Sequence, residues 1–277
     1  MKLRSLIRDW IPPILLRHLR RNLPILAAQE IQFTGNYSSW DEASTYASGY
    51  ASQEILEKTR DALLKVKRGE AACERDSVTF DTVQYSYPLL ANLLHIASCN
   101  GNRLAVLDFG GALGSSYYQN RGYLSHLQQL AWTVVEQPHV VACGREYFAN
   151  GILSFHHSID EAMAGMQPHV ILLSSVLQYL PAPLDVAGVL ASRNVRDIII
   201  DRAPLLEDAP SRLTVQHVPP SIYEASYPCW IFNENEFVAA FKGYRMIDAF
   251  DAHVDTTIPL GDATARYRGF RLTKVMI

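Results

Sequence analysis

The stretch that decides the fold is LAVLDFGGALGSS, residues 104–116. Its first six residues form a short apolar run of the kind that becomes a buried strand. The glycines that follow let the backbone turn tightly and let a ligand approach the main chain. A helix that starts after this turn presents unpaired N–H groups at its positive end. Strand, turn and helix together predict a site for a nucleotide-like ligand above Gly110–Gly114.

From Arg103 onward, short apolar runs alternate with helical stretches. This alternation is typical of a parallel sheet covered by helices on both faces. We therefore predict an α/β fold with a doubly wound, Rossmann-like sheet. The expected strands are residues 104–109, 132–136, 152–155, 169–174 and 197–201, followed by an antiparallel edge pair at 243–250 and 267–275. The expected helices are residues 117–129, 138–149, 159–166 and 183–193.

The residues before this pattern predict a helical N-terminal extension, residues 1–98, ahead of a ligand-binding domain, residues 99–277. Ser39 or Asp41 predicts the cap of a helix that runs through Glu42 and Ala43. Apolar residues at helical spacing predict further helices near residues 52–68 and 87–98. Residues 1–30 are basic and apolar and are interrupted by Pro12-Pro13. Such a segment either packs on the body or a partner subunit, or lies on an anionic membrane surface.

Composition excludes several classes of protein. The formal net charge of −3 argues against bulk nucleic-acid binding, which needs a basic footprint. No apolar run reaches the roughly 18–20 residues of a membrane span. The four cysteines form no C-x-x-C pair, so we expect free thiols in a reducing, cytoplasmic compartment. Adjacent His156 and His157 would point to opposite faces of a strand, so we expect no metal site there.

Two acidic residues refine the ligand prediction. Asp108 ends the first strand, and Glu136 ends the second, where an acid can accept hydrogen bonds from both hydroxyls of a ribose. A glycine turn followed by a ribose-binding acid fits a binding site for NAD and one for S-adenosylmethionine equally well. Asp108 favours S-adenosylmethionine, because a carboxylate beside the turn attracts an ammonium group and repels a pyrophosphate.

Three segments carry a family resemblance. DFGGALG, residues 108–114, resembles motif I of class I S-adenosylmethionine-dependent methyltransferases. VVEQPHVV, residues 134–141, and VILLSSVLQYLP, residues 170–181, resemble their second strand and their fourth strand with its following helix. With GNYSSWDEA at 35–43, Gly49-Tyr50 and ASYPCWIF at 225–232, the chain is similar to a methyltransferase family of bacterial surface-polysaccharide and O-antigen gene clusters.

The resemblance implies a seven-stranded methyltransferase sheet and transfer of a methyl group, expected on a hydroxyl of a sugar or glycan precursor. It implies a small-molecule or glycan acceptor, and an enzyme that is cytoplasmic or peripheral on the inner membrane face through residues 1–30. The expected cofactor-binding residues are Asp108, Gly110, Gly111, Gly114, Glu136, Gln137, His157, Ser158, Ser174 and Tyr50. Against the family pattern, Ala112 replaces a glycine, Gln137 a small apolar residue, and Gln178 a frequent histidine.

Catalytic residues are expected after the fifth strand. Residues 205–232 are proline-broken and aromatic, as an acceptor-binding lid over about 203–235 would be. A sugar hydroxyl benefits from a base, and the candidates are His217, preferred, with Asp201 and Tyr227. The alternative for His217 is a hydrogen bond within a loop. Tyr223, Tyr227 and Trp230 could stack on a sugar or simply pack the lid onto the core.

Two other functions stay open. One is a methyltransferase-like module that binds the cofactor or a partner without turnover. The other is a nicotinamide-dependent oxidoreductase or epimerase of nucleotide sugars, which would need a G-x-G-x-x-G turn and a Tyr-x-x-x-Lys pair that the chain lacks. The sequence does not indicate the acceptor, the atom methylated or the oligomeric state.

Overall fold

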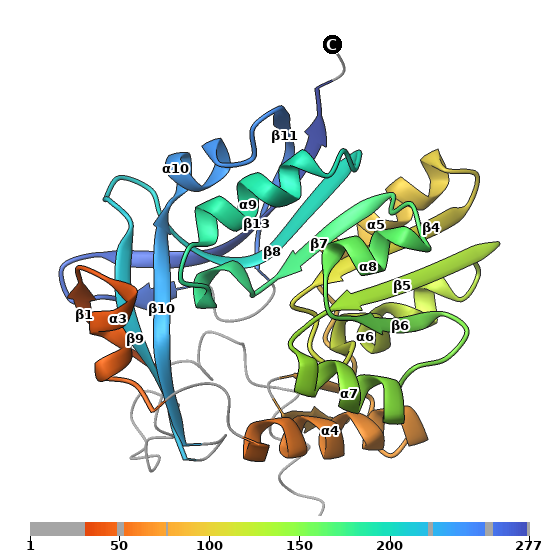
Figure 1. Cartoon of the computed structure of the whole chain (residues 1–277), viewed down its shortest axis with the longest axis horizontal. Helices are drawn as coiled ribbons and strands as arrows, with labels where there is room; N and C mark the ends of the chain where they lie inside the picture. Colours follow the sequence, from red (N-terminus) through yellow and green to blue (C-terminus); the bar gives the residue numbers. More distant parts are fainter. Residues whose placement is uncertain (1–30, 49–52, 76, 221–223, 253–256, 276–277) are drawn as a thin grey trace, which may run out of the picture.

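A computed structural model describes residues 31–48, 53–75, 77–220, 224–252 and 257–275. Its centre is a parallel sheet in the order β6-β5-β4-β7-β8, extended by β13 and β11, which run antiparallel (Figure 1). The strands are β4 (Arg103–Phe109), β5 (Gln129–Val135), β6 (Leu153–His156), β7 (Val170–Ser174), β8 (Asp197–Leu206), β11 (Tyr244–Asp251) and β13 (Thr264–Lys274), with the short β12 (Thr257–Pro259) on β13. The predicted parallel sheet and the antiparallel edge pair are confirmed.

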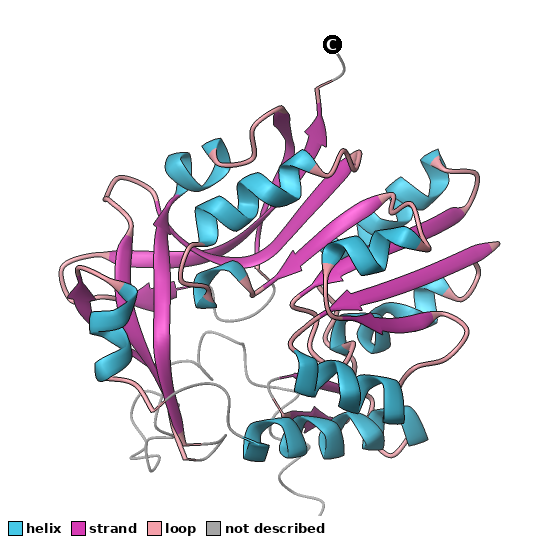
Figure 2. Cartoon of the chain, viewed as in Figure 1, coloured by secondary structure: helices cyan, strands magenta, loops and turns pink. Residues whose placement is uncertain are grey.

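Helices cover both faces of this sheet, as the doubly wound prediction requires (Figure 2). One face packs against α4 (Gln53–Arg68), α5 (Tyr87–Cys99), α6 (Ser115–Leu124) and α7 (Pro138–Tyr147). The other packs against α8 (Ile159–Ala164), α9 (Pro183–Ser192) and α10 (Glu234–Ala239). Successive strand side chains alternate between the faces, so Val106 and Leu107 are both fully buried but in different clusters.

The chain reverses its direction of travel across the sheet at β4. It first runs outward through β5 and β6, then returns to the other side of β4 to form β7 and β8. The carboxyl ends of β4, β5, β6, β7 and β8 therefore share one edge of the sheet. The crevice at such a switch point is where open α/β sheets bind ligands.

The predicted lid is mostly strand, so the expectation of a long loop at 205–232 is wrong. β8 continues to Leu206, and β9 (Arg212–Val218) and β10 (Ala225–Asn233) form an antiparallel pair. β9 pairs with β1 on one side and β10 on the other, and Leu213 to Gln216 are all buried, so pairing and burial outweigh the proline signal of the surrounding segment. Pro228 is tolerated because β10 meets β8 only at Phe232 and Asn233, which leaves its other side unpaired at the proline.

The N-terminal extension is only partly helical. It contains α3 (Trp40–Thr45), α4 and α5, but also the strand β1 (Gln32–Tyr37), which pairs with β9, and the hairpin β2 (Cys73–Arg75) with β3 (Val78–Phe80). The basic segment 1–30, Tyr50 and Tyr223 lie outside the described residues. In the part of the chain that the structure describes, no helix is long and apolar enough to cross a membrane.

Candidate functional site

The glycine turn after β4 has the tight backbone that its sequence predicts. Gly110 and Gly114 have positive φ angles of 70° and 92°. A Cβ on Gly110 would lie 2.2 Å from Val176, and one on Gly111 would lie 2.5 Å from the Asp108 carboxyl group. Ala112, at the position where the family pattern has glycine, also has a positive φ of 48°. The backbone has thus kept a glycine-like conformation that an L-residue adopts only with strain of about 1–2 kcal/mol.

Asp108 lies directly beneath this turn and is completely buried. Its Oδ2 accepts a hydrogen bond from Trp132 Nε1 at 2.9 Å, while its Oδ1 has no partner among the described residues. Burial raises the pKa of this carboxyl from 3.8 to about 7; the Trp132 bond and Arg202 oppose the shift, and nearby Glu136 adds to it. An orphaned buried carboxylate oxygen beside a glycine turn is a ready partner for a ligand cation.

Glu136 closes the other side of the turn from the end of β5. Its carboxylate accepts hydrogen bonds from the backbone N–H of Ala112 at 3.2 Å and of Gln137 at 2.9 Å. Burial raises its pKa above the ordinary value, against the effect of these two bonds. The carboxylate therefore lies at the carboxyl edge, as a ribose-binding acid should. Gln137 is exposed and contributes its backbone N–H to Glu136.

The carboxyl ends of β7 and β8 carry a second polar cluster. Ser174 and Asp201 are register partners, and Ser174 Oγ donates to Asp201 Oδ2 at 3.1 Å. Asp201, 2% exposed, also accepts from Ser86 Oγ at 3.4 Å. Arg202 pairs with Asp201 at 3.5 Å and donates to Ser174 Oγ at 3.2 Å. Asp201 therefore fixes Ser174 and Arg202 at the edge rather than meeting solvent itself.

The end of β6 carries His157 and Ser158, both exposed. The backbone N–H of His157 donates to Glu161 Oε2 at 2.9 Å, and Ser158 Oγ caps α8 by accepting from the Glu161 N–H at 3.1 Å. The hydroxyl of Ser158 thus has a structural role in capping. Both residues lie on the same edge as Asp108 and Glu136, because β6 is parallel to β5. No group of three or more potential metal ligands occurs among the described residues.

The three catalytic candidates are not brought together. Tyr227 lies within a buried network: Tyr179 OH donates to Gln216 Oε1 at 3.0 Å, and Gln216 Nε2 to Tyr227 OH at 3.5 Å. His217 follows Gln216 on β9, so its side chain lies on the opposite face of that strand. Its Nε2 is bonded to Thr34 Oγ1 of β1 at 2.9 Å. The residue expected in a loop therefore joins two strands.

Several residues of the site were not found from the sequence. Trp132 is identifiable as the Asp108 partner only once the register of β4 and β5 is known. Glu74 of β2, 7% exposed, accepts a hydrogen bond from Ser115 Oγ at 2.6 Å, at the first residue of α6. No local motif marks Glu74, because the contact joins residues 41 positions apart.

Comparison with known proteins found no matching family model and no matching curated protein. Among solved structures, the chain is similar to a 1,6-didemethyltoxoflavin-N1-methyltransferase from Burkholderia thailandensis with S-adenosylhomocysteine bound: 16% identity, 90% of this chain and 97% of that chain covered, TM-score 0.45. It is also similar to CalS10, an amino pentose methyltransferase from Micromonospora echinaspora: 9% identity, 68% and 91% covered, TM-score 0.42.

A structure of the [4+2]-cyclase SpnF is similar as well, with 10% identity, 81% of this chain and 97% of that chain covered, and a TM-score of 0.49. These similarities accompany the α/β sheet already described. Identities this low and TM-scores below 0.5 do not determine a reaction. Any assignment of function therefore depends on the chemistry of the site.

Proposed function

We propose that the protein is an S-adenosylmethionine-dependent methyltransferase. The observation that carries the proposal is the pair of carboxylates at the glycine turn. Asp108 keeps one oxygen without a partner beneath the turn, and Glu136 lies at the end of the next strand. The first suits the ammonium group of the cofactor, and the second suits the two ribose hydroxyls. When bound, the cofactor supplies an electrophilic methyl group on a sulfonium.

The same geometry argues against a nicotinamide cofactor. A dinucleotide places its pyrophosphate at the start of the helix after the turn. Here the Glu74 carboxylate already meets Ser115 at the first residue of α6, and the Asp108 carboxyl lies under the turn. Two carboxyl groups beside this position would repel a pyrophosphate when ionised. Donors and acceptors at the turn are thus arranged for a cationic ligand.

The chain's own residues would bind and orient rather than perform covalent chemistry. We propose that Gly110, Gly111 and Gly114 let the cofactor approach the backbone, that Ser174 and Gln137 line its ends, and that His157 and Ser158 contact the adenine. Tyr50 belongs to the same expectation. Holding the acceptor in line with the methyl group is worth roughly 7–11 kcal/mol at best.

We further propose that the acceptor is a neutral, hydroxylated molecule such as a sugar or glycan precursor of a surface polysaccharide. The support is the resemblance of the sequence and the uncharged polar network in which Tyr179, from the short helical turn after β7, contacts Gln216 of β9, which in turn contacts Tyr227 of β10. In this proposal, residues 203–235 cover the acceptor, and Asp201 is a positioning residue. His217 remains a candidate base that turnover measurements must test.

The first test is calorimetry of S-adenosylhomocysteine and NAD on the wild type and two variants. Glu136→Ala should weaken S-adenosylhomocysteine binding by about 1–3 kcal/mol, because it removes charge-assisted hydrogen bonds. Glu207→Ala, which removes an exposed carboxylate just beyond β8, should leave binding unchanged. Preference for NAD, or equal binding by wild type and Glu136→Ala, would refute the proposal. Binding without turnover on any sugar acceptor would favour the non-catalytic module.

A further inference from the structure

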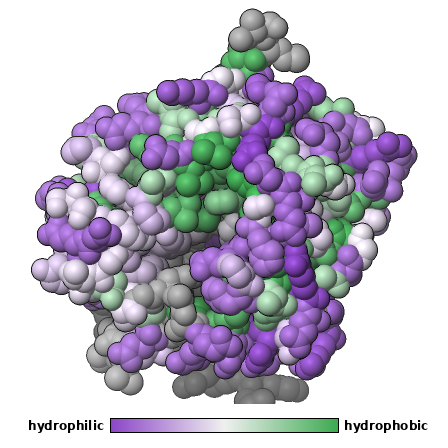
Figure 3. Space-filling model, in the orientation of Figure 1, coloured by the Kyte–Doolittle hydropathy of each residue, from purple (hydrophilic) through white to green (hydrophobic). Residues whose placement is uncertain are grey.

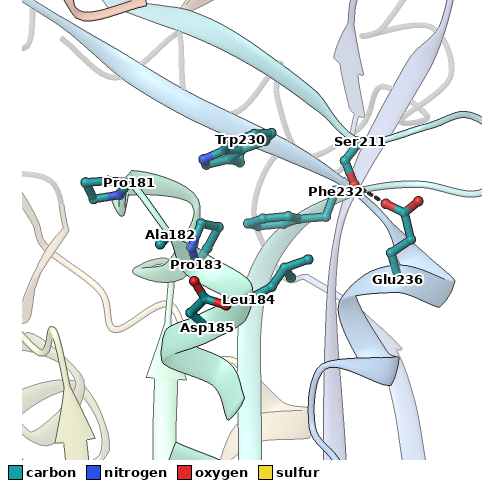
Figure 4. Close-up of a pocket in the computed structure, with 9 residues that line it drawn as sticks. All are labelled: Pro181, Ala182, Pro183, Leu184, Asp185, Ser211, Trp230, Phe232 and Glu236. Atoms are coloured by element: carbon teal, nitrogen blue, oxygen red, sulfur yellow. Dashed lines mark hydrogen bonds between the residues drawn. The ribbon is translucent and has the colours of Figure 1, made fainter. Parts of the chain in front are cut away.

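A second pocket lies on the far side of β10 from the Tyr227 network. It has a volume of about 240 Å³ and lies between β10 and the first turns of α9 and α10 (Figure 4). Trp230 and Phe232 face it from β10, and Pro181, Pro183 and Leu184 face it from the start of α9. Side chains alternate along a strand, so Trp230 and Tyr227 point to opposite faces of β10. None of the expected cofactor-binding residues lines this pocket, so it is distinct from the proposed cofactor site.

The indole of Trp230 has an unmet hydrogen bond. Its Nε1 is buried and has no partner among the described residues. Figure 4 shows the ring across the pocket from Pro183, with its nitrogen on the side of Pro181. Pro181 and Pro183, at the N-terminal end of α9, have no N–H, and no side chain caps this end of the helix. A buried donor without a partner is destabilising, and a ligand acceptor would relieve this cost.

The polar groups of the pocket are acidic. Asp185 and Glu236 are exposed at its rim, and none of the residues lining it is cationic. Ser211 is already engaged: its Oγ donates to Glu236 Oε2 at 2.7 Å and accepts from the Asn233 N–H at 2.8 Å. The pocket therefore offers one unpaired donor at the indole and carboxylate acceptors at the rim.

These groups select the chemistry of the ligand. An anion would be repelled by the two carboxylates, and a simple cation has no acceptor for the Trp230 N–H. A neutral ring that carries hydroxyl groups satisfies both, because each hydroxyl both donates and accepts. Its apolar face would stack on the indole. The volume falls just below the ~300 Å³ of the smallest drug-sized sites, which fits about one ring.

We propose that this pocket is an accessory binding site for a single neutral sugar ring, separate from the cofactor site. Its hydroxyls accept from Trp230 Nε1 and donate to Asp185 and Glu236. Hydrophobic side chains gather on the face of the molecule that α9 covers, as expected for a surface on which a sugar stacks (Figure 3). Leu184, 36% exposed, forms part of the wall of the pocket and is accessible to substitution.

The test is ligand-observed NMR with methyl β-D-glucopyranoside and methyl β-D-galactopyranoside, compared with glucuronate and cyclohexylmethylamine. At least one methyl hexoside should bind, and the anion should not. Trp230→Phe keeps an aromatic face but removes the N–H donor together with the five-membered ring, so it should weaken binding by about 2- to 10-fold. Leu184→Trp fills the pocket and should weaken binding more than about 10-fold.

Val189→Trp is the matched control, because Val189 lies on the same helix at 47% exposure and does not line the pocket. It should bind the hexoside like the wild type. S-adenosylhomocysteine binding, which should be equal in all three variants, separates this proposal from the proposed function, and thermal unfolding checks that each variant is folded. Binding of the amine alone, no hexoside binding at tens of millimolar, or hexoside binding unchanged in Leu184→Trp would overturn the accessory site.

Discussion

The buried carboxyl of Asp108 makes a prediction that links stability, pH and cofactor binding. Its pKa is about 7 in the folded protein against 3.8 ordinarily. Between these two values the unfolded chain releases the proton while the folded chain keeps it. Rising pH therefore favours the unfolded state across this window, and above about pH 7 the difference stays constant. The full shift of about three pKa units corresponds to about 4 kcal/mol.

The perturbation is Asp108→Asn, which keeps an oxygen for the Trp132 bond and removes the titration. The wild type should lose about 2–3 kcal/mol between pH 5 and pH 8 that the variant does not lose. Urea unfolding at several pH values measures this difference. Asp262→Asn is the control: Arg212 lowers the pKa of that exposed carboxyl below 3.8, so this substitution should not change the loss of stability between pH 5 and pH 8.

The same variant should lose affinity for the cofactor. An ionised Asp108 attracts the ammonium group, so S-adenosylhomocysteine should bind the wild type more tightly at pH 8 than at pH 6. Asp108→Asn should bind more weakly at pH 8, by about 1–3 kcal/mol. Parallel pH profiles of unfolding in wild type and variant would refute the buried neutral carboxyl. Equal affinity at pH 8 would refute Asp108 as the ammonium partner.

Three further substitutions test the site. Ala112→Gly should raise stability by up to about 1 kcal/mol, since relief of strain at φ 48° exceeds the added chain entropy, and denaturant unfolding measures it. Gly110→Ala should destabilise the fold by about 1–3 kcal/mol, because its Cβ would lie 2.2 Å from Val176; a thermal-shift assay showing no change contradicts the turn geometry. His217→Ala should reduce stability by about 1 kcal/mol through loss of the Thr34 bond and should retain turnover, whereas lost turnover with normal cofactor binding would establish His217 as the base.

The core sheet could be predicted because its signals are local. Each of β4 to β7 is a short apolar run followed by a turn and a helix, and pattern alone locates such runs. The boundaries shifted by a few residues, as for β5, which begins at Gln129 instead of Trp132. The predicted end of the fifth strand at Asp201 was too early, since the continuation through Leu206 depends on pairing with β13 and β10.

The strands β1, β9 and β10 could not be predicted for the same reason. Each is held by a partner far away in the chain, as when Gln32 pairs with His217. Prolines at 204 and 228 indicated a loop, because local sequence does not show which side of a strand lacks a neighbour. The error changed the expected role of His217 from a loop base to a residue that joins two strands.

The positions of the expected cofactor-binding residues could be predicted more fully because parallel strands bring their carboxyl ends to one edge. The sequence places Asp108, Glu136 and Ser174 at three such ends, and the structure finds them there. Hydrogen-bond partners were not predictable. Trp132 of β5 donates a hydrogen bond to Asp108 of the neighbouring strand β4, and Glu74 contacts Ser115 from the N-terminal hairpin.

Backbone strain distinguishes this edge of the sheet from the other. At the amino edge, the positive-φ residues before β4 and β8 are Asn102 and Asn194, a residue type that tolerates this conformation. At the carboxyl edge, Ala112, Ser175 and Arg202 have φ angles of 48°, 56° and 57°. Alanine, serine and arginine side chains do not stabilise a positive φ angle locally. Strain of this kind persists where surrounding contacts over-determine the backbone, as they do at ligand sites. These residues follow β4 and β7 or, for Arg202, lie in β8 just beyond its pairing with β7. Their position therefore supports the same edge that the carboxylates identify, from an independent property of the chain.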